Sequence, residues 1–145
     1  MKMFKARRMR DGDEDAVIRL LNLNFPHVAM TGEKLLLRLS KGSRFFVADE
    51  GGKVVGFCEL RLGKNALLRG IAVKTGLREK GAGTVLVQKA VGEARKIGRR
   101  SLYVKVEVGN EKALRVYGNM GFAIRREIVS RMGERLYLMR KDLEN

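Results

Sequence analysis

The chain has 145 residues, 45% of them hydrophobic, which is enough for one domain with a sizeable core. Its 31 Lys and Arg residues outnumber 16 acidic residues, and the net charge of +15 favours partners that carry phosphate or other anions. One Cys and one His argue against a disulfide framework, a zinc site or a nucleophile–His–Asp triad. No apolar run approaches the length of a membrane span or a signal-peptide core. We therefore expect a single cytoplasmic domain over residues 1–145 that uses no metal and no membrane.

The first third of the chain is predicted to form a strand and two helices. Residues Phe4 to Met9 form the strand, and Asp11 or Asp13 is the N-cap of a helix that Pro26 ends. A second helix begins near Thr31 and stops before position 42, where a glycine follows.

Three strands are expected next. The segments Phe45–Ala48 and Lys53–Leu62 flank the turn sequence Asp-Glu-Gly-Gly and form a hairpin. The segment Leu67–Val73 forms the following strand. Gly70 within it indicates either a bulge, a place where a ligand approaches the backbone, or only a weakened strand.

The second half begins with a long helix over Ala82–Ile97, which has one apolar stripe and ends at a glycine. Strict alternation predicts a strand over Leu102–Val108. Asn110 then caps a short helix that Gly121 closes, and a final hairpin occupies residues 122–139. The order β-α-α-β-β-β-α-β-α-β-β indicates an α/β fold, with a mixed central sheet of about seven strands and helices on both faces.

A glycine-rich turn before the helix Ala82–Ile97 carries the clearest chemical signal. The first N–H groups of a helix have no partners within it and lie at its positive end, so a turn there can hold phosphate. Gly81 and Gly83 lack the Cβ atoms that would obstruct a pyrophosphate, while Arg78 and Lys80 add positive charge.

Two other phosphate-binding loops share part of this pattern and fail on spacing. A P-loop requires Lys and then Ser or Thr where Ala82 and Gly83 stand. A dinucleotide fingerprint requires a third glycine at position 86, which is Leu86. The remaining pattern, Arg-x-x-Gly-x-Gly at Arg78, Gly81 and Gly83, resembles the pyrophosphate loop of the GNAT superfamily of N-acetyltransferases.

A second motif makes this resemblance specific. It reads Asn-x-x-Ala-x-x-x-Tyr-x-x-x-Gly-Phe and places its fixed residues at Asn110, Ala113, Tyr117, Gly121 and Phe122. The order of elements also resembles the GNAT fold, so the similarity covers nearly the whole chain. Within this superfamily, the chain broadly resembles the branch that acetylates ribosomal proteins and protein N-termini.

The resemblance implies that acetyl-CoA is the cosubstrate and lies where the strand Leu67–Val73 separates from the next strand. The backbone of Ile71, Ala72 and Val73 would bind the pantetheine arm. Asn110 would contact the arm, cap its helix, or do both. The residues whose backbone would hold the pyrophosphate are Arg78, Glu79, Lys80, Gly81, Ala82, Gly83 and Thr84.

The resemblance also implies direct attack of an amine on the thioester in a ternary complex. The backbone N–H of Val73 would polarise the thioester carbonyl, and Tyr117 would contact the cosubstrate and protonate the leaving thiolate. Without the motif, Tyr117 would be read as an aromatic that fills the face of a helix.

The sequence does not identify the general base that accepts the proton of the amine. Related N-terminal acetyltransferases carry Glu-Val-Arg in the strand before the Asn, whereas this chain has Lys105 in place of the glutamate. Glu107 lies two residues further on the same face, and Glu59 lies on an adjoining strand. Either carboxylate or an ordered water could accept the proton, and His27 could line the acceptor site.

The family resemblance and the chemistry of amines together indicate the acceptor and the partners. A protein N-terminus or a small-molecule amine fits, and a peptide α-amine is favoured because its pKa of about 8 lies below the value of about 10.4 for lysine. The basic surface suits association with ribosomal or nucleic-acid-bound proteins. A nucleic-acid-binding module and a catalytically silent acyl-CoA-binding regulator are the competing readings, and either a monomer or a homodimer is expected.

Overall fold

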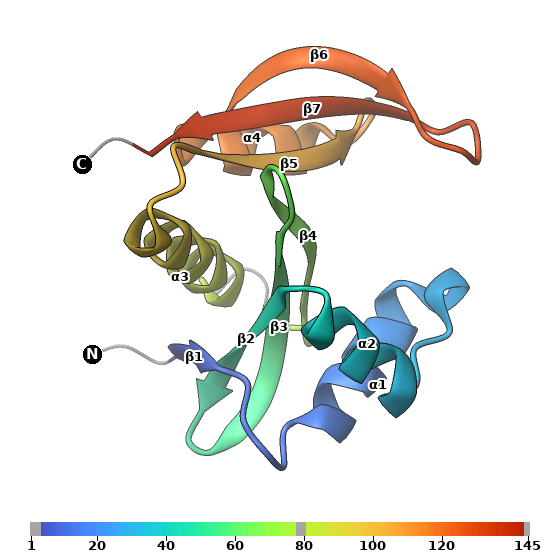
Figure 1. Ribbon diagram of the computed structural model, residues 1–145, viewed down its shortest axis with the longest axis vertical. Helices are drawn as coiled ribbons and strands as arrows, with labels where there is room; N and C mark the ends of the chain where they lie inside the picture. Colours follow the sequence, from blue (N-terminus) through green and yellow to red (C-terminus); the bar gives the residue numbers. More distant parts are fainter. Residues whose placement is uncertain (1–3, 78–80, 144–145) are drawn as a thin grey trace.

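The computed structural model describes residues 4–77 and 81–143. Seven strands form one sheet in the order β1-β2-β3-β4-β5-β7-β6 (Figure 1). The strands are β1 (Lys5–Arg8), β2 (Ser43–Glu50), β3 (Lys53–Leu62), β4 (Ala66–Val73), β5 (Ser101–Glu107), β6 (Ala123–Val129) and β7 (Arg135–Asp142). The helices are α1 (Glu14–Asn24), the short 3-10 helix η1 (Pro26–Val28), α2 (Gly32–Ser40), α3 (Ala82–Ile97) and α4 (Glu111–Asn119).

The predicted α/β class, the seven-stranded mixed sheet and the order of elements are confirmed. Helix α3 has the predicted bounds, because Gly81 and Gly98 both adopt left-handed backbone at its ends, with φ of 94° and 96°. Thr31 caps α2 by accepting a hydrogen bond from the Lys34 N–H at 3.2 Å. None of the helices in residues 4–77 and 81–143 is long and apolar enough to cross a bilayer.

Asp13 occupies the predicted N-cap position of α1, but the expected capping contact is absent. Its side chain makes no capping hydrogen bond to the helix. It instead accepts hydrogen bonds from the Arg7 guanidinium at 2.8 Å and from the Arg10 N–H at 2.8 Å. These bonds from Arg7 outweigh burial and hold the pKa of Asp13 below its usual value. The carboxylate therefore fixes the strand β1 rather than the first turn of the helix.

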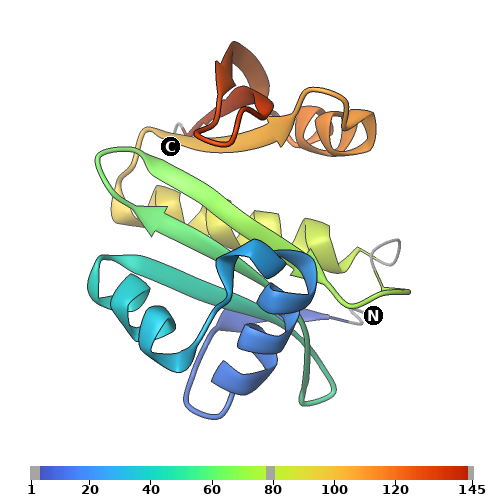
Figure 2. The same cartoon turned by 90° about the vertical axis from the view of Figure 1, so that its right-hand side faces the viewer.

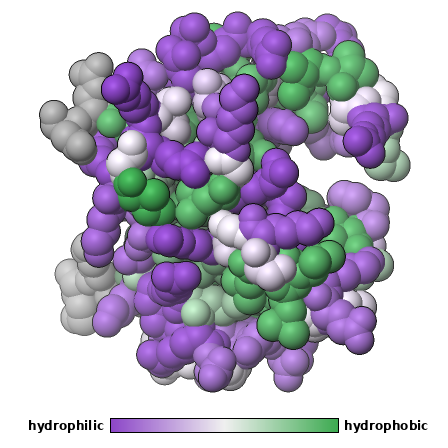
Figure 3. All heavy atoms as spheres, viewed as in Figure 1, coloured by the Kyte–Doolittle hydropathy of each residue, from purple (hydrophilic) through white to green (hydrophobic). Residues whose placement is uncertain are grey.

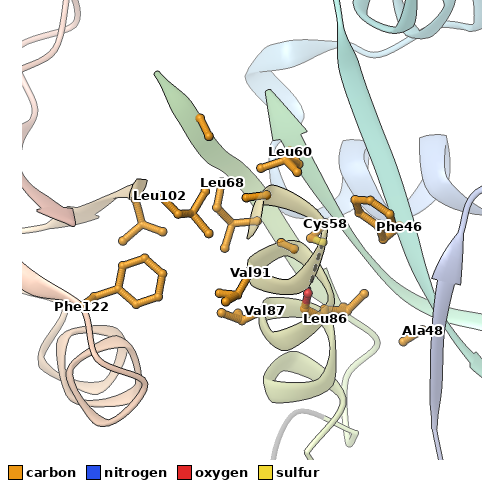
Figure 4. Packing of buried hydrophobic residues seen from close by; sticks show 14 of the residues in the cluster. Phe46, Ala48, Cys58, Leu60, Leu68, Leu86, Val87, Val91, Leu102 and Phe122 are labelled. Carbon is orange, nitrogen blue, oxygen red and sulfur yellow. Dashed lines mark hydrogen bonds between the residues drawn. The ribbon is translucent and has the colours of Figure 1, made fainter. Parts of the chain in front are cut away.

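Two apolar layers cover the sheet, one on each face. Helices α1 and α2 pack on one face, where Phe45 and Phe57 are buried side by side. Helix α3 packs on the other face (Figure 2) and buries residues such as Leu86 against β3 and β4. The Cys58 thiol of β3 donates to the Leu86 carbonyl at 3.6 Å and ties the strand to this helix (Figure 4). Gly56 allows the close packing, because a Cβ there would lie 3.3 Å from the Leu86 side chain.

The sheet opens between β4 and β5. These parallel strands pair over only three positions, which end at Leu68 and Val104. The described pairing of β4 with β5 stops there, and the unit of β5, β7 and β6 runs across the direction of β3 and β4 (Figure 1). The register of β3 and β4 also shifts at Arg69, so a bulge, one of the alternatives for Gly70, is present just where the strands separate. The fold thus creates a wedge in the middle of the sheet.

Candidate active site

The N-terminus of α3 lies beside the mouth of this wedge. Among the described residues, a Cβ on Gly81 would meet no atom within 4 Å, and a Cβ on Gly83 would lie 4.0 Å from Val73, which is ordinary contact. Because the first backbone N–H groups of a helix have no partners within it, those of α3 can donate hydrogen bonds to an anion. The predicted contacts of Arg78, Glu79 and Lys80 lie outside the described residues.

A groove of about 680 Å³ continues from this end between α3 and α4. Thr84 lines its start and is exposed, whereas Ala82 is fully buried beneath it. Arg95 also lines the groove, and its Nε is buried without a hydrogen-bond partner among the described residues. An elongated ligand with polar groups thus fits a path that leads from the helix terminus along α3.

The backbone of β4 presents alternate residues to the wedge. The Lys74 N–H donates to the Val55 carbonyl of β3 at 2.7 Å, so the backbone groups of Lys74 point towards β3. In an antiparallel pair these groups alternate in direction. Ala72 therefore also directs its backbone towards β3, whereas Ile71 and Val73 direct theirs towards β5. Of the three predicted pantetheine contacts, geometry favours Ile71 and Val73.

Asn110 is the N-cap of α4, as predicted. Its Oδ1 accepts a hydrogen bond from the Ala113 N–H at 3.1 Å. Asn110 follows β5, which ends at Glu107, and the contact fixes the start of α4 at Glu111. The side-chain amide nitrogen makes no further hydrogen bond within the described part of the chain, so a ligand contact and the capping contact are compatible.

Tyr117 lies on the inner side of α4 and packs edge-on against Phe122, with ring centroids 5.5 Å apart. It joins the core cluster on the α3 face, which includes Cys58 and Leu68. Burial raises the pKa of Tyr117 to about 12, with a smaller contribution from Cys58. The phenol therefore keeps its proton throughout the physiological range. Its hydroxyl makes no hydrogen bond to a described residue, so its proton is available to a ligand.

Glu59 is the most buried carboxylate near the wedge, with 1% exposure. It accepts hydrogen bonds from Arg38 of α2 at 2.7 Å, from the Ser43 hydroxyl at 2.7 Å and from Arg69 at the bulge. Burial alone would raise the pKa of Glu59, but the hydrogen bonds from Arg69 and Ser43 and the charges of the two arginines lower it overall. A carboxylate stabilised in this way is a weak proton acceptor.

A pocket of about 260 Å³ lies over this cluster, on the face that α1 and α2 cover. Its lining combines apolar side chains, such as those of Phe25 and Phe57, with Arg38 and Arg69. Gly70 forms part of the floor and leads to the open part of β4. Figure 3 shows a hollow between the part of the surface over β6 and β7 and the part over α1. The pocket and the α3 terminus thus reach the wedge from opposite faces of the sheet.

The remaining predicted residues are separated from one another. His27 is exposed in η1 and lines the pocket over Glu59. Glu107 is exposed at the end of β5, opposite Leu136 of β7, and does not line that pocket. The sequence reasoning missed Arg38 and Arg69, although the bulge expected near Gly70 could have drawn attention to its neighbour.

The sequence pattern of the acetyltransferase (GNAT) family matches residues 14–122. An uncharacterized N-acetyltransferase of Methanocaldococcus jannaschii, MJ1207, is 37% identical over 86 residues, which cover 54% of this chain and 38% of that protein. The chain therefore spans less than half the length of this relative.

Solved structures share the whole arrangement. The ribosomal-protein-S18-alanine N-acetyltransferase of Escherichia coli has a TM-score of 0.82 at 20% identity, over 99% of this chain and 96% of that one. yncA of Salmonella typhimurium, described as a putative acetyltransferase with its cofactor acetyl-CoA, has a TM-score of 0.82 at 19% identity over the same shares. At these identities the likeness concerns the fold.

Proposed function

The chain belongs to the GNAT family of acetyltransferases, and on this basis we propose that it transfers the acetyl group of acetyl-CoA to a primary amine. The observation that supports this most directly is the wedge that begins beyond Leu68 and Val104. It is open to α3 and its anion-binding terminus on one face, and to a pocket lined by Phe25 and Phe57 on the other. Two substrates can therefore meet in the middle of the sheet from opposite sides.

The cosubstrate would extend from the α3 terminus into the wedge. The backbone N–H groups of α3 around Gly83 would bind its pyrophosphate. Backbone groups of Ile71 and Val73 would bind the pantetheine amides as a neighbouring strand does, and the Val73 N–H would polarise the reacting carbonyl. These placements use backbone groups, which explains why glycines form part of the sequence signal.

Tyr117 would supply the proton that the departing thiolate needs. Its raised pKa keeps the phenol protonated at neutral pH. Its helix begins at the Asn110 cap, which fixes the ring beside the wedge. General acid catalysis of this kind requires a positioned donor within hydrogen-bond reach of the sulfur.

We assign Glu59 to holding Arg38 and Arg69 rather than to proton transfer. Its lowered pKa makes it a weak base, and all of its oxygens already accept hydrogen bonds. A peptide α-amine, with a pKa of about 8, is partly neutral near pH 7.5 and can lose its proton to solvent. Glu107 is the other carboxylate at the wedge that a water molecule could connect to the amine.

An acceptor panel tests this proposal. Thiol release from acetyl-CoA would be followed with peptides that have free N-termini, polyamines, aminoglycosides and amino acids, and each product would be identified by mass spectrometry. Turnover of at least one primary amine is expected, with peptide α-amines the best substrates. Binding of acetyl-CoA without turnover of any amine would contradict the proposal and favour an acyl-CoA-binding regulator. Turnover of a polyamine with no peptide turned over would overturn the preference for an α-amine.

A further inference from the structure

The pocket over Glu59, which would receive the amine, is called the acceptor pocket below. A row that contains basic side chains crosses the open face of the sheet next to it. The strand registers place Arg61 opposite Leu67, Leu67 opposite Tyr103, and Tyr103 opposite Arg140. These residues therefore lie on one face across four adjacent strands. The next row, two residues along β5, runs from Lys105 through Leu138 to Arg126.

These rows line a groove of about 580 Å³ that holds six basic residues and no acidic residue among those described. The bulge at Arg125 places it beside Arg126 on the groove side, so β6 contributes two guanidinium groups in succession. Lys105 and Arg126 are exposed and make no hydrogen bond or ion pair with a described residue. Arg140 is the partly compensated member, because it forms an ion pair with Asp142 at 3.0 Å.

The groove is continuous with the acceptor pocket. A connecting depression of about 480 Å³ shares Arg38 and Arg69 with the acceptor pocket and Arg61 with the basic groove. Glu59 is the single acidic residue among the described residues that line the three hollows, and two arginines already neutralise it. The path from the wedge to β6 therefore carries a net positive charge among the described residues.

We propose that the acceptor is the N-terminus of a polypeptide whose next residues are acidic, and that these residues lie along this groove. The inference rests on the proposed transfer to an amine and specifies its substrate. From Gly70 at the pocket to Leu67 in the groove is three steps along β4, or roughly 10 Å at ~3.3 Å a step. An extended peptide covers that length in about three residues, so acidic side chains from about the third residue onward meet Arg61 and Lys105.

A polypeptide fits this path better than a nucleic acid. The groove connects with the acceptor pocket, which must receive a primary aliphatic amine. The standard nucleotides have no such amine. Single-stranded nucleic acids also bind through stacked aromatic rings. Tyr103 is the one aromatic residue among the described residues of the groove and the connecting depression. Charge complementarity with carboxylates needs no such rings.

The test compares three peptides with the same first two residues and with Glu, Gln or Lys at positions 3 to 7. Steady-state acetylation of each peptide would be measured at low and at high salt. A dipeptide amide, which is too short to reach the groove, would be assayed as a further substrate. The Glu peptide is expected to have a KM about tenfold below that of the Gln peptide at low salt, and the difference should shrink at high salt. The Lys peptide should have the highest KM.

Two double variants with the same change in charge sharpen the test. Lys105→Glu/Arg126→Glu should raise KM for the Glu peptide by about tenfold and abolish its advantage over the Gln peptide. Lys53→Glu/Lys96→Glu alters two exposed lysines outside the groove and should leave that advantage in place. Circular dichroism of both variants would check that they fold.

The outcomes separate the two proposals. Turnover of the dipeptide amide with equal KM values for the Glu and Gln peptides would overturn this inference while the amine acetyltransferase stands. No turnover of any amine would reject the proposed function, and the inference with it. Tighter binding of an RNA oligomer than of the Glu peptide, lost in Lys105→Glu/Arg126→Glu, would overturn the inference in favour of a nucleic-acid partner.

Discussion

Leu68 of β4 and Val104 of β5 are the last two residues that pair before these neighbouring strands diverge. Both side chains are buried on the α3 face, so the point of divergence is fixed by the core rather than by a loop. The opening is consequently part of the folded sheet and exists before any ligand enters. The first two predictions concern Gly83 of α3 and Tyr117 of α4.

Replacement of Gly83 by Val should weaken binding of CoA at least about tenfold, or ~1.4 kcal/mol. Among the described residues a Cβ at this position meets Val73 alone, at 4.0 Å, so the fold tolerates it, whereas the added methyl groups would crowd a pyrophosphate bound at this helix terminus. Calorimetric titration with CoA measures the effect. Gly32→Val is a matched control, because it also lies in the first turn of a helix with no atom near its Cβ. Equal affinity in both variants would show that the pyrophosphate binds elsewhere.

Tyr117→Phe should lower kcat by ~10²-fold and leave the affinity for acetyl-CoA nearly unchanged. The ring and its contact with Phe122 remain, and only the proton donor is lost. Tyr137→Phe is a suitable control, since Tyr137 is a half-buried phenol that packs on the same core cluster. Steady-state kinetics with single-turnover measurements would separate chemistry from product release. Parental single-turnover rates in Tyr117→Phe would make Tyr117 a packing residue.

Glu59→Gln should destabilise the fold by about 2–3 kcal/mol at pH 7. Loss of one partner of a buried pair typically costs ~3–5 kcal/mol, and the value is smaller here because Arg38 and Arg69 keep contact with water. Urea unfolding measures the change. Glu127→Gln breaks an exposed pair with Arg135 at 2.8 Å and should change stability little.

The effect of Glu59 should also depend on pH. Its pKa is lower in the folded protein than in the unfolded chain, so the unfolded state takes up the proton first as the pH falls. The stabilisation is complete above the unfolded value of about 4.3 and is lost as the pH falls from there through the folded pKa. The difference between the parent and Glu59→Gln should therefore narrow below about pH 4. A constant difference between pH 7 and pH 3 would contradict this assignment.

Asn110→Ala should destabilise the protein by about 1 kcal/mol, because the Ala113 N–H loses its capping acceptor. Asn110→Ser keeps a capping oxygen and should restore most of that stability. The pair separates the two roles of the residue. If the side-chain amide also binds the pantetheine arm, Asn110→Ser will be stable but will bind acetyl-CoA more weakly than the parent. Full affinity in the stable variant would leave capping as its whole function.

The elements of the chain could be read from the sequence because their signals are local. The bounds of α3 follow from Gly81 and Gly98, and the cap of α4 follows from Asn110. The wedge was expected from a family resemblance, since no periodicity shows where two strands stop pairing.

Long-range contacts were beyond the sequence. Arg38 and Arg69 lie 21 and 10 residues from Glu59, on a helix and at a bulge, so only the assembled sheet brings the three charges together. The cap predicted for Asp13 failed for a local reason, because Arg7 of β1 and the Arg10 N–H, six and three residues away, bind its carboxylate instead. The basic groove, by contrast, depends on the registers of four strands and on the bulge that adds Arg125 to the groove side.

The wedge has a consequence for the behaviour of the protein without its cosubstrate. Strands whose edges are not fully paired can recruit strands of other molecules, which is the first step of β-aggregation. Most sheets keep such edges at their margins, whereas this one has them in its interior beyond Leu68 and Val104. Lys105 and Glu107 place opposite charges along β5 there, which discourages intrusion by an apolar strand. A saturating concentration of CoA should therefore slow heat-induced aggregation by more than its effect on the unfolding midpoint accounts for.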